Sequence, residues 1–257
     1  ITIPAMNLLL LQNNSLSENL NNSLSENSDN SLSGNLVRIT GRQLQQLTNV
    51  QRSAVGDTVR VGEINGLIGS ATIIELKSSE ALLQINLSSP PPPPIPLTLI
   101  MAMPRPKMLR RSLQTIAAMG VKEIYLINSM RVEKSYWQTP FLKPEAVEEE
   151  FILGLEQARD TIMPTLHIRK RFKPFVEDEL PAIIQGRKNL LAHPVTETRC
   201  PIDIQQPATL AIGPEGGFIP YEVELLSAAG FETVHIGPRI LRVETAVPAL
   251  LSRLFPA

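Results

Sequence analysis

The sequence predicts an α/β protein in two parts, a small β-barrel followed by a domain in which strands and helices alternate around a parallel sheet. Three observations predict this. Short β-branched runs joined by tight turns fill residues 1–89. The proline run "PPPPPIP" occupies residues 90–96. Beyond it, apolar runs alternate with helical patterns through residues 97–257. The two expected domains, 1–89 and 97–257, are therefore joined by a stiff extended linker.

Composition is that of a folded protein in a reducing compartment. With 257 residues, 43% hydrophobic and 19% charged, the chain can bury a substantial core. A net charge of −1 excludes a globally basic nucleic-acid binder but leaves room for a local basic face. The single cysteine, Cys200, cannot form an internal disulfide, and no apolar run nears the roughly 20 residues a bilayer requires. No basic residue precedes the apolar run at the N-terminus, so we expect a cytoplasmic protein without a secretion signal.

The predicted barrel starts with two strand-like runs that flank a low-complexity insertion. "MNLLLL" (6–11) and "NLVRIT" (35–40) lie on either side of residues 13–35, where an octapeptide rich in Ser and Asn repeats. Such a segment buries too little to offset the entropy of ordering it, so a loop is favoured over a binding repeat. After it, "GRQLQQLTNV" (41–50) predicts one short helix.

The remaining barrel strands are separated by two glycine turns. "GDTVRVGEINGLIGSATIIEL" and "EALLQINL" are brief β-branched runs, split at Gly56-Asp57 and Asn65-Gly66. This spacing favours antiparallel strands.

Six apolar strands and five helices are expected in the second part. The strands are "LTLIMAM" (97–103), "KEIYLIN" (122–128), "TLHIRKRF" (165–172), "NLLAHP" (189–194), "ATLAIG" (208–213) and "FETVHIG" (231–237). Helical patterns cover 107–119, 144–162, 174–184 and 220–229, and a last helix begins near Val243 or Glu244, with Pro248 expected in its first turn. Alternation of this kind predicts a parallel sheet covered on both faces.

The tripeptide Ile-Gly-Pro ends two of these strands. It occurs at 212–214 and at 236–238, each time before a helix. In parallel sheets ligands bind beyond the carboxyl ends of strands, and glycine lets a ligand approach the backbone closely. Arg239, Arg242 and Glu244 beside the second turn favour a binding site over two plain connections. The chain lacks G-x-x-x-x-G-K-[ST], and no G-x-G-x-x-G opens a helix, so nucleotide loops of those types are not supported.

These turns carry a family resemblance. "IGPEGGF" (212–218) and "EVELLSAAGFETVHIGPRILRVETA" (222–246) resemble the C-terminal signature of the ribosomal RNA small-subunit methyltransferase E family, within the SPOUT superfamily. Members methylate N3 of a uridine in small-subunit (16S) ribosomal RNA. The resemblance implies a PUA-like β-barrel that binds RNA, an α/β domain with a trefoil knot, S-adenosylmethionine as methyl donor, and a homodimer formed through the knotted domain.

The resemblance also implies site residues. The donor is expected against His193, Leu210, Gly213, Glu215, Gly217, Ile236, Gly237, Ile240, Leu241, Arg242, Thr245 and Ala246. Uracil N3 holds its proton at neutral pH. Arg242 is therefore the candidate for favouring the deprotonated ring, and Glu215 or Glu244 for accepting the proton, with a helix-capping role equally open for Glu244.

Basic residues predict the contact with RNA, against the alternative of a solvated surface. The candidates are Arg52, Arg60, Lys107, Arg110, Arg131, Arg169, Lys170 and Arg171. Of the histidines, His235 is expected to be structural, and His167 lies either near RNA or on a solvated strand. Cys200 is expected to be an unreactive loop or core thiol. Three histidines and one cysteine predict no metal site.

Three departures from the family pattern leave the RNA target open. Residues 115–121 read "TIAAMGV" where the family has Lys-Ala-x-Glu-Leu-Gly-Val. "EQARDTIMP" displaces the arginine of Glu-Gln-x-x-Arg to Arg159, and "QLTNVQR" keeps only Leu47, Val50 and Arg52 of the barrel motif. A methyltransferase with another RNA target, and an RNA-binding protein that no longer catalyses, are the two alternatives.

Overall fold

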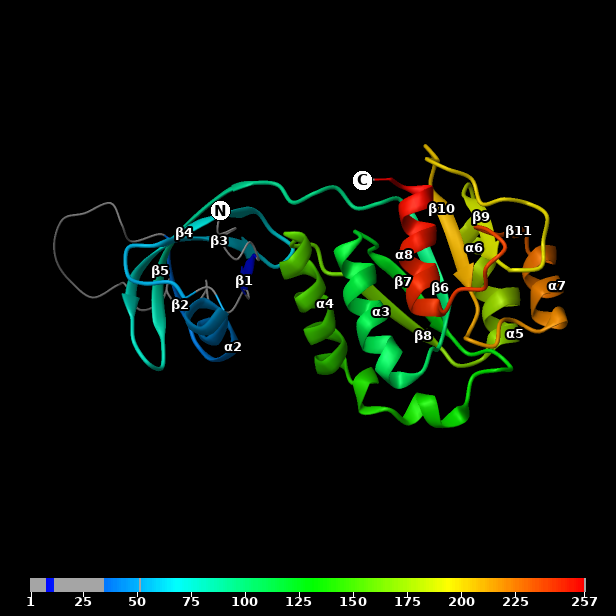
Figure 1. Ribbon diagram of the computed structural model, residues 1–257, viewed down its shortest axis with the longest axis horizontal. Helices are drawn as coiled ribbons and strands as arrows, with labels where there is room; N and C mark the ends of the chain where they lie inside the picture. The colour runs from blue at the N-terminus through cyan, green and yellow to red at the C-terminus, as the bar shows by residue number, and fades with distance from the viewer. Residues whose placement is uncertain (1–7, 12–34, 51, 257) are drawn as a thin grey trace. The chain divides into compact units, whose positions relative to one another are not determined.

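The computed structural model describes residues 8–11, 35–50 and 52–256, and the chain forms two compact units (Figure 1). The first contains the residues up to Pro93 together with Leu155–Met163, and the second contains Pro94–Gly154 and Pro164–Ala257. Apart from Asn35, the insertion predicted at 13–35 lies outside the described residues, as do residues 1–7. No helix in the described ranges combines the length and apolar character needed to cross a membrane.

The first unit is built on a five-stranded sheet with the order β1-β3-β4-β5-β2. Its strands are β1 (Leu9–Leu11), β2 (Leu36–Ile39), β3 (Thr58–Glu63), β4 (Ile68–Leu76) and β5 (Ala81–Ser89). The β3–β4, β4–β5 and β5–β2 pairs are antiparallel as predicted, whereas β1 pairs with β3 in parallel. The predicted helix at 41–50 is α2 (Gly41–Gln45) continued by a π-helical turn, η1 (Gln46–Val50), and Leu44 and Leu47 join the strands' buried core.

Residues 155–163 complete this unit. The Leu8 N–H donates to the carbonyl of Glu156, and the Asn65 N–H donates to the carbonyl of Thr161. They comprise the last turn of α4 (Pro144–Ala158) and the residues directly after it, and α4 ends four residues before the predicted position. Arg159 has φ +58°, a left-handed conformation that stops the helix, so the prediction of helix to 162 was wrong.

The second unit is a six-stranded, wholly parallel sheet with the order β11-β9-β10-β6-β7-β8. All six predicted strands are present: β6 (Leu97–Ala102), β7 (Glu123–Ile127), β8 (Thr165–Arg169), β9 (Lys188–Ala192), β10 (Ala208–Ile212) and β11 (Glu232–Val234). Every residue of β6 and β10 is buried, which explains why these central strands read as largely apolar runs.

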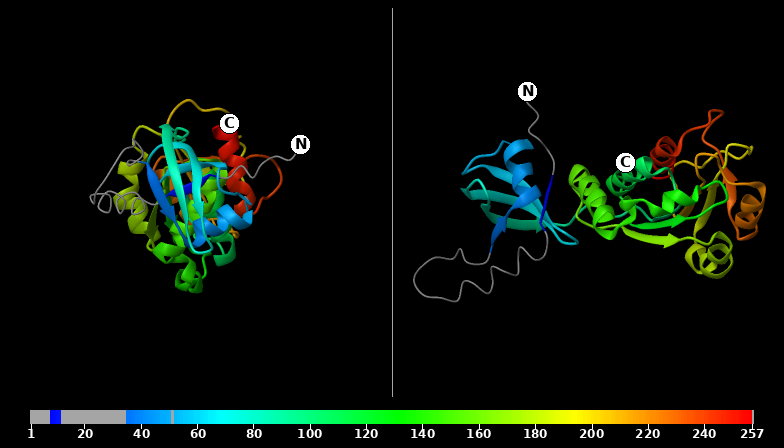
Figure 2. Two further views of the ribbon diagram at one scale, coloured as in Figure 1. Left: turned by 90° about the vertical axis from the view of Figure 1, so that its left-hand side faces the viewer. Right: turned by 90° about the horizontal axis from the view of Figure 1, so that it is seen from below.

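Helices cover both faces of this sheet. The α-helices are α3 (Pro106–Ala118), α4, α5 (Phe172–Pro174), α6 (Leu180–Ile184), α7 (Pro220–Ala228) and α8 (Val243–Leu254); η4 (Phe175–Glu179) is a π turn, and η2 (Lys134–Gln138) and η3 (Pro140–Leu142) are 3₁₀ turns. α3 and α8 pack together on one face, with α5 and α6 on the other (Figure 2). Since α8 begins at Val243, Pro248 lies in its second turn and not in the first as expected.

The chain between β9 and β10 contacts both the segment after β11 and the end of α8. The Cys200 N–H donates to the carbonyl of His235 at 2.8 Å. The N–H groups of Asp203 and Ile204 donate to the carbonyls of Arg253 and Leu254. Residues 200–204 are thereby held against His235 and the end of α8.

Candidate functional site

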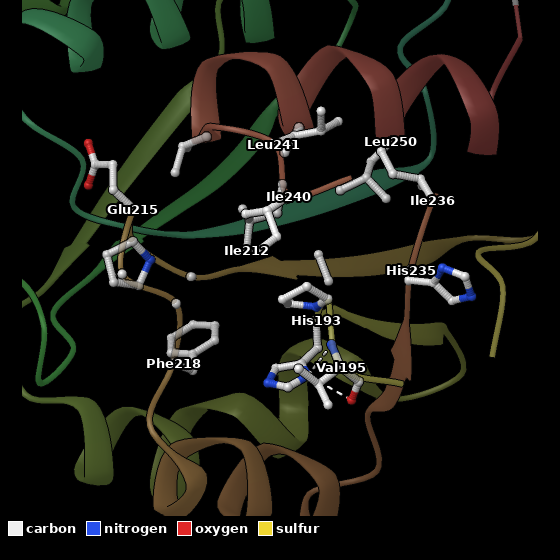
Figure 3. Close-up of a pocket in the computed structure, with 18 of the residues that line it drawn as sticks. His193, Val195, Ile212, Glu215, Phe218, His235, Ile236, Ile240, Leu241 and Leu250 are labelled. Carbon is white, nitrogen blue, oxygen red and sulfur yellow. Dashed lines mark hydrogen bonds between the residues drawn. The ribbon is translucent and has the colours of Figure 1, made fainter. Parts of the chain in front are cut away.

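A pocket of about 350 Å³ opens at the carboxyl ends of β9, β10 and β11 in the second unit (Figure 3). Its walls come from the two Ile-Gly-Pro turns, the residues after β9 and the start of α8. The lining residues are Arg131, Ala192–Val195, Ile212–Phe218, Val234–Gly237, Arg239–Leu241, Val243, Ala246 and Leu250. In Figure 3, Ile240 and Leu241 face His193 and Val195 across the pocket, with Ile212 between them. The two turns that the sequence singled out therefore form one site.

The first turn depends on glycine at two points. The Gly217 N–H donates to the carbonyl of Pro214 at 2.7 Å, and Gly217 has φ +71°, a conformation that favours glycine. A Cβ on Gly213 would lie 3.0 Å from the main-chain nitrogen of Phe218. The turn thus folds back on itself, and Phe218 is buried beneath it.

The second turn leads directly into α8. Gly237 has φ +147°, and Arg242, with extended backbone, is the residue before the helix. Ile240 is 83% exposed although it lines the pocket. The apolar surface of this wall is therefore open to a ligand.

Most residues predicted to hold a cofactor lie around the pocket. Those that line it are His193, Gly213, Glu215, Gly217, Ile236, Gly237, Ile240, Leu241 and Ala246. Leu210 is buried in the middle of β10 and does not line the pocket, nor do Arg242 and Thr245, which are exposed at the start of α8.

Of the candidate catalytic side chains, Glu215 alone lines the pocket. Its Oε1 accepts the Arg105 N–H at 3.0 Å, which ties the first turn to the residues before α3. Arg242 has an 85% exposed side chain, and its Nη1 lies 4.0 Å from Oε1 of Glu244. Glu244 is mostly buried in the first turn of α8, where its carboxylate suits the helix dipole.

The loop after β7 is fastened to the first turn. Arg131 lines the pocket, and its Nη1 donates to the carbonyl of Gly216. The carboxylate of Glu222, which is 3% exposed, accepts the N–H of Met130 at 2.7 Å and that of Ile219 at 3.0 Å. The loop after β7 and the connection from β10 to α7, which are distant in sequence, thus meet at one wall.

The basic residues predicted to bind RNA differ in their surroundings. Arg110 donates to Glu150 and lies 5.1 Å above the ring of Phe141, and Arg169 pairs with Glu179 at 2.6 Å. These two charges are already compensated within the second unit. Exposed side chains are found at Arg52, Arg60, Lys107, Arg131, Lys170 and Arg171. Lys170 lies 5.8 Å above the ring of Trp137.

Histidine and cysteine residues take three different positions. His193 lines the pocket, and its Nδ1 lies within hydrogen-bond distance of the N–H and carbonyl of Val195. His235, expected to be structural only, also lines the pocket. His167 stacks on Tyr125 and approaches Glu123 on β7 and β8. Cys200 is buried as expected, and burial raises the pKa of its thiol to about 11.

The sequence reasoning missed several pocket residues, among them Val195, Phe218, His235 and Leu250. Phe218 directly follows the glycine turn, and Leu250 lies on the same face of α8 as Val243 and Val247, which are buried with it. The apolar stripe of that helix was a usable signal. Val195 carried none, because it belongs to no periodic segment.

Comparisons with known proteins agree with this geometry. Residues 91–255 match the family model described as an RNA methyltransferase domain. A ribosomal RNA small subunit methyltransferase E from Treponema pallidum is 30% identical over 212 residues, covering 79% of this chain and 78% of that protein. The chain belongs to the ribosomal RNA small subunit methyltransferase E family.

Two further members of this family are similar over most of their length. The methyltransferase E of Synechocystis is 26% identical over 226 residues, covering 85% of this chain and 72% of that protein. The solved structure of the Neisseria gonorrhoeae methyltransferase E, bound to S-adenosylmethionine, covers 95% of both chains with a TM-score of 0.69 and 21% identity. At that identity the structural match establishes the shared fold.

Proposed function

We propose that this chain transfers a methyl group from S-adenosylmethionine to N3 of a uridine in small-subunit ribosomal RNA. The observation that carries the proposal is the pocket between the two Ile-Gly-Pro turns in a member of the methyltransferase E family. The similarity to ribosomal RNA small subunit methyltransferases supports the rRNA substrate, and the S-adenosylmethionine bound to the Neisseria protein supports the donor.

The pocket suits a nucleoside that carries an amino acid. Its volume of about 350 Å³ falls in the range of small-ligand sites. Ile212, Ile240 and Leu250 offer apolar surface, and the peptide groups of the two turns offer donors and acceptors for polar edges. When bound, the donor supplies a methyl group on a positively charged sulfur. We assign its binding to the nine predicted residues that line the pocket, with Leu210 supporting the first turn from inside β10.

Residues around the pocket would align the uridine and manage its proton. Alignment contributes most to a direct displacement. Arg242, which is exposed beside Leu241 of the pocket wall, stabilises the ring once N3 has lost its proton. Glu215 is favoured over Glu244 as the base because only Glu215 lines the pocket. We also propose that Thr245, in the first turn of α8, contacts the methyl donor.

The finer architecture is also part of the proposal. We assign the first unit as a PUA-like barrel and the second as a trefoil knot, supported by the hydrogen bonds that hold residues 200–204 against His235 and the end of α8. We also propose a homodimer through the second unit, in keeping with membership of the methyltransferase E family. The protein acts in the cytoplasm, where its rRNA substrate is found.

Mass spectrometry of ribosomal RNA tests the reaction. Deletion of the gene should abolish N3-methyluridine in small-subunit RNA, and the wild-type chain should restore it, whereas the variant with Arg242→Ala should restore little. An unchanged N3-methyluridine level in the deletion strain contradicts the proposed substrate. Isothermal titration with S-adenosylmethionine tests the donor separately.

A second candidate is methylation of another RNA. Its support is the segment 115–121, which lacks the Lys and Glu of the family pattern. Methyl transfer to transfer RNA or large-subunit RNA, with none to small ribosomal subunits, would favour it. Retained RNA binding without donor binding would instead favour a protein that no longer catalyses.

A further inference from the structure

We infer that Glu222 is a positioning residue that sets Arg131 at the wall of the pocket, where Arg131 contacts the RNA substrate. The inference rests on the proposed function and concerns the same site. It starts from the burial of a carboxylate. Glu222 lies in the first turn of α7 and is 3% exposed, although an ionised carboxylate is costly to bury without strong hydrogen bonds.

Its two oxygen atoms serve two different segments. Oε2 accepts the N–H of Ile219, three residues earlier, which is a local cap of α7. Oε1 accepts the N–H of Met130, which lies 92 residues away in the loop after β7. Helix capping explains the first hydrogen bond but not the second. The second bond joins the loop after β7 to the start of α7.

That loop places one cation on the pocket. Arg131 follows Met130 directly, lines the pocket, and donates to the carbonyl of Gly216. The fit is close, because a Cβ on Gly216 would lie 3.0 Å from Cδ of Arg131. The Met130 side chain is 75% exposed, so the main chain of this residue, and not its side chain, anchors the loop.

Arg131 is suited to an anionic partner at the rim. Arg131 is exposed. Its guanidinium group has five N–H donors, and the hydrogen bond to Gly216 uses one of them. The apolar residues Ile240 and Leu241 lie on the wall formed by the second turn. We assign this apolar wall to the methyl donor, and we assign Arg131 to a phosphate of the RNA. Glu222 fixes the loop before the RNA arrives.

The substitution Glu222→Gln isolates this role. Glutamine keeps the size and shape of the side chain but replaces one acceptor oxygen with an NH₂ donor, so it can satisfy Ile219 or Met130 but not both. Glu224→Gln is the matched control, since Glu224 is exposed on the same helix. Arg131→Ala removes the cation itself.

The test measures three quantities on the full chain and these variants: amide hydrogen exchange in residues 128–133, the Kd for S-adenosylmethionine, and the Kd for small ribosomal subunits from a strain lacking the gene. For E222Q we expect faster exchange, a donor Kd within twofold of wild type, and an RNA Kd raised about tenfold. In the R131A background E222Q should raise the RNA Kd less than twofold, because its effect passes through Arg131. E224Q should match wild type.

Three other outcomes overturn the inference. Additive losses of RNA affinity for E222Q and R131A mean that Glu222 does not act through Arg131. A donor Kd that rises as much as the RNA Kd indicates a general structural role for Glu222. Wild-type protein that binds the subunits without methylating them contradicts the proposed function, while the RNA affinities still decide the role of Glu222. Equal RNA Kd values for wild type, E222Q and R131A contradict the inference itself.

Discussion

Gly213 is a residue at which the first turn leaves little room for a side chain. A Cβ there would lie 3.0 Å from the Phe218 nitrogen and 3.1 Å from its ring carbon Cδ2. Gly213→Ala should therefore displace the turn that the donor is proposed to contact, and weaken S-adenosylmethionine binding at least tenfold in isothermal titration. Ser227→Ala, on the exposed face of α7, serves as the control. Unchanged donor affinity in G213A would show that the turn does not contact the donor.

The buried thiol of Cys200 should make the stability of the fold fall at alkaline pH. Burial raises the pKa of its thiol from 9.0 to about 11, so the unfolded chain loses this proton first as the pH rises. The stability that Cys200 contributes is therefore complete below about pH 9 and is lost by about pH 11. The loss amounts to roughly 2 kcal/mol.

The comparison with Cys200→Ala isolates this titration from those of tyrosine and lysine. Urea denaturation at pH 8 and pH 11 should show that wild type loses about 2 kcal/mol more than the variant. Parallel pH dependence of the two proteins would contradict the assigned thiol environment.

At the residue scale, the sequence predicted those parts of the site that are contiguous along the chain. The turns at 212–218 and 236–241 carry glycine and proline, whose backbone preferences are local, and both line the pocket. Arg131 and Leu250 reach the same pocket from other elements. Their positions follow from the strand order of the sheet, which local patterns do not encode. Arg110 illustrates the converse: a basic run predicted RNA contact, whereas Glu150 from α4 compensates the charge.

At the scale of elements, α8 is held at its end by the chain between β9 and β10. Nε of Arg253 donates to the carbonyl of Cys200 at 2.7 Å, next to the main-chain bonds that join residues 203 and 204 to 253 and 254. Arg253→Met keeps the apolar part of the side chain and removes the donor. It should lower the free energy of unfolding by about 1.5 kcal/mol.

Thermal and urea unfolding of R253M measure this effect, with Arg199→Met as control because Arg199 is exposed in the same connection. If R199M and R253M lose equal stability, the hydrogen bond from Arg253 to Cys200 makes no measurable contribution to the free energy of unfolding. Loss of donor affinity in R253M alone would further indicate that α8 must be held in place for the pocket to form.

Elements were predictable where one periodicity dominates. The buried strands β6 and β10 are largely apolar runs, and α3 and α7 end close to the predicted positions. The end of α4 was not predictable, because Arg159 adopts a left-handed conformation without being glycine. The parallel pairing of β1 with β3 also escaped prediction, since strand direction depends on a long-range connection.

At the scale of the whole molecule, the chain passes between the two units more than once. The proline run is visible in the sequence, but the membership of residues 155–163 in the first unit is not. It depends on contacts over more than a hundred residues, such as Arg42 with Glu156. Glu156 is 3% exposed, and its carboxylate accepts both Nη1 and Nη2 of Arg42, at 2.9 and 3.0 Å, and the Leu10 N–H at 3.3 Å.

Glu156→Gln should therefore destabilise the first unit more than the second. Glutamine cannot accept from both nitrogens of Arg42, and it removes the negative charge that pairs with the guanidinium group. Loss of a buried pair costs about 3–5 kcal/mol, but Arg42 is 39% exposed and solvent compensates part of this, so we expect about 2 kcal/mol. Amide exchange in β1 and β5 should then accelerate roughly thirtyfold.

The single tryptophan, Trp137, reports on the other unit, because it lies between β7 and α4 in the part that belongs to the second unit. In Glu156→Gln, the urea midpoint of the Trp137 fluorescence transition should therefore shift by less than expected from the loss of stability that amide exchange in β1 and β5 reports. Glu149→Gln, on the exposed side of α4, should change neither measurement. Equal shifts in both would mean that the two units unfold together, since a cooperative chain distributes the loss of one contact over all its amides.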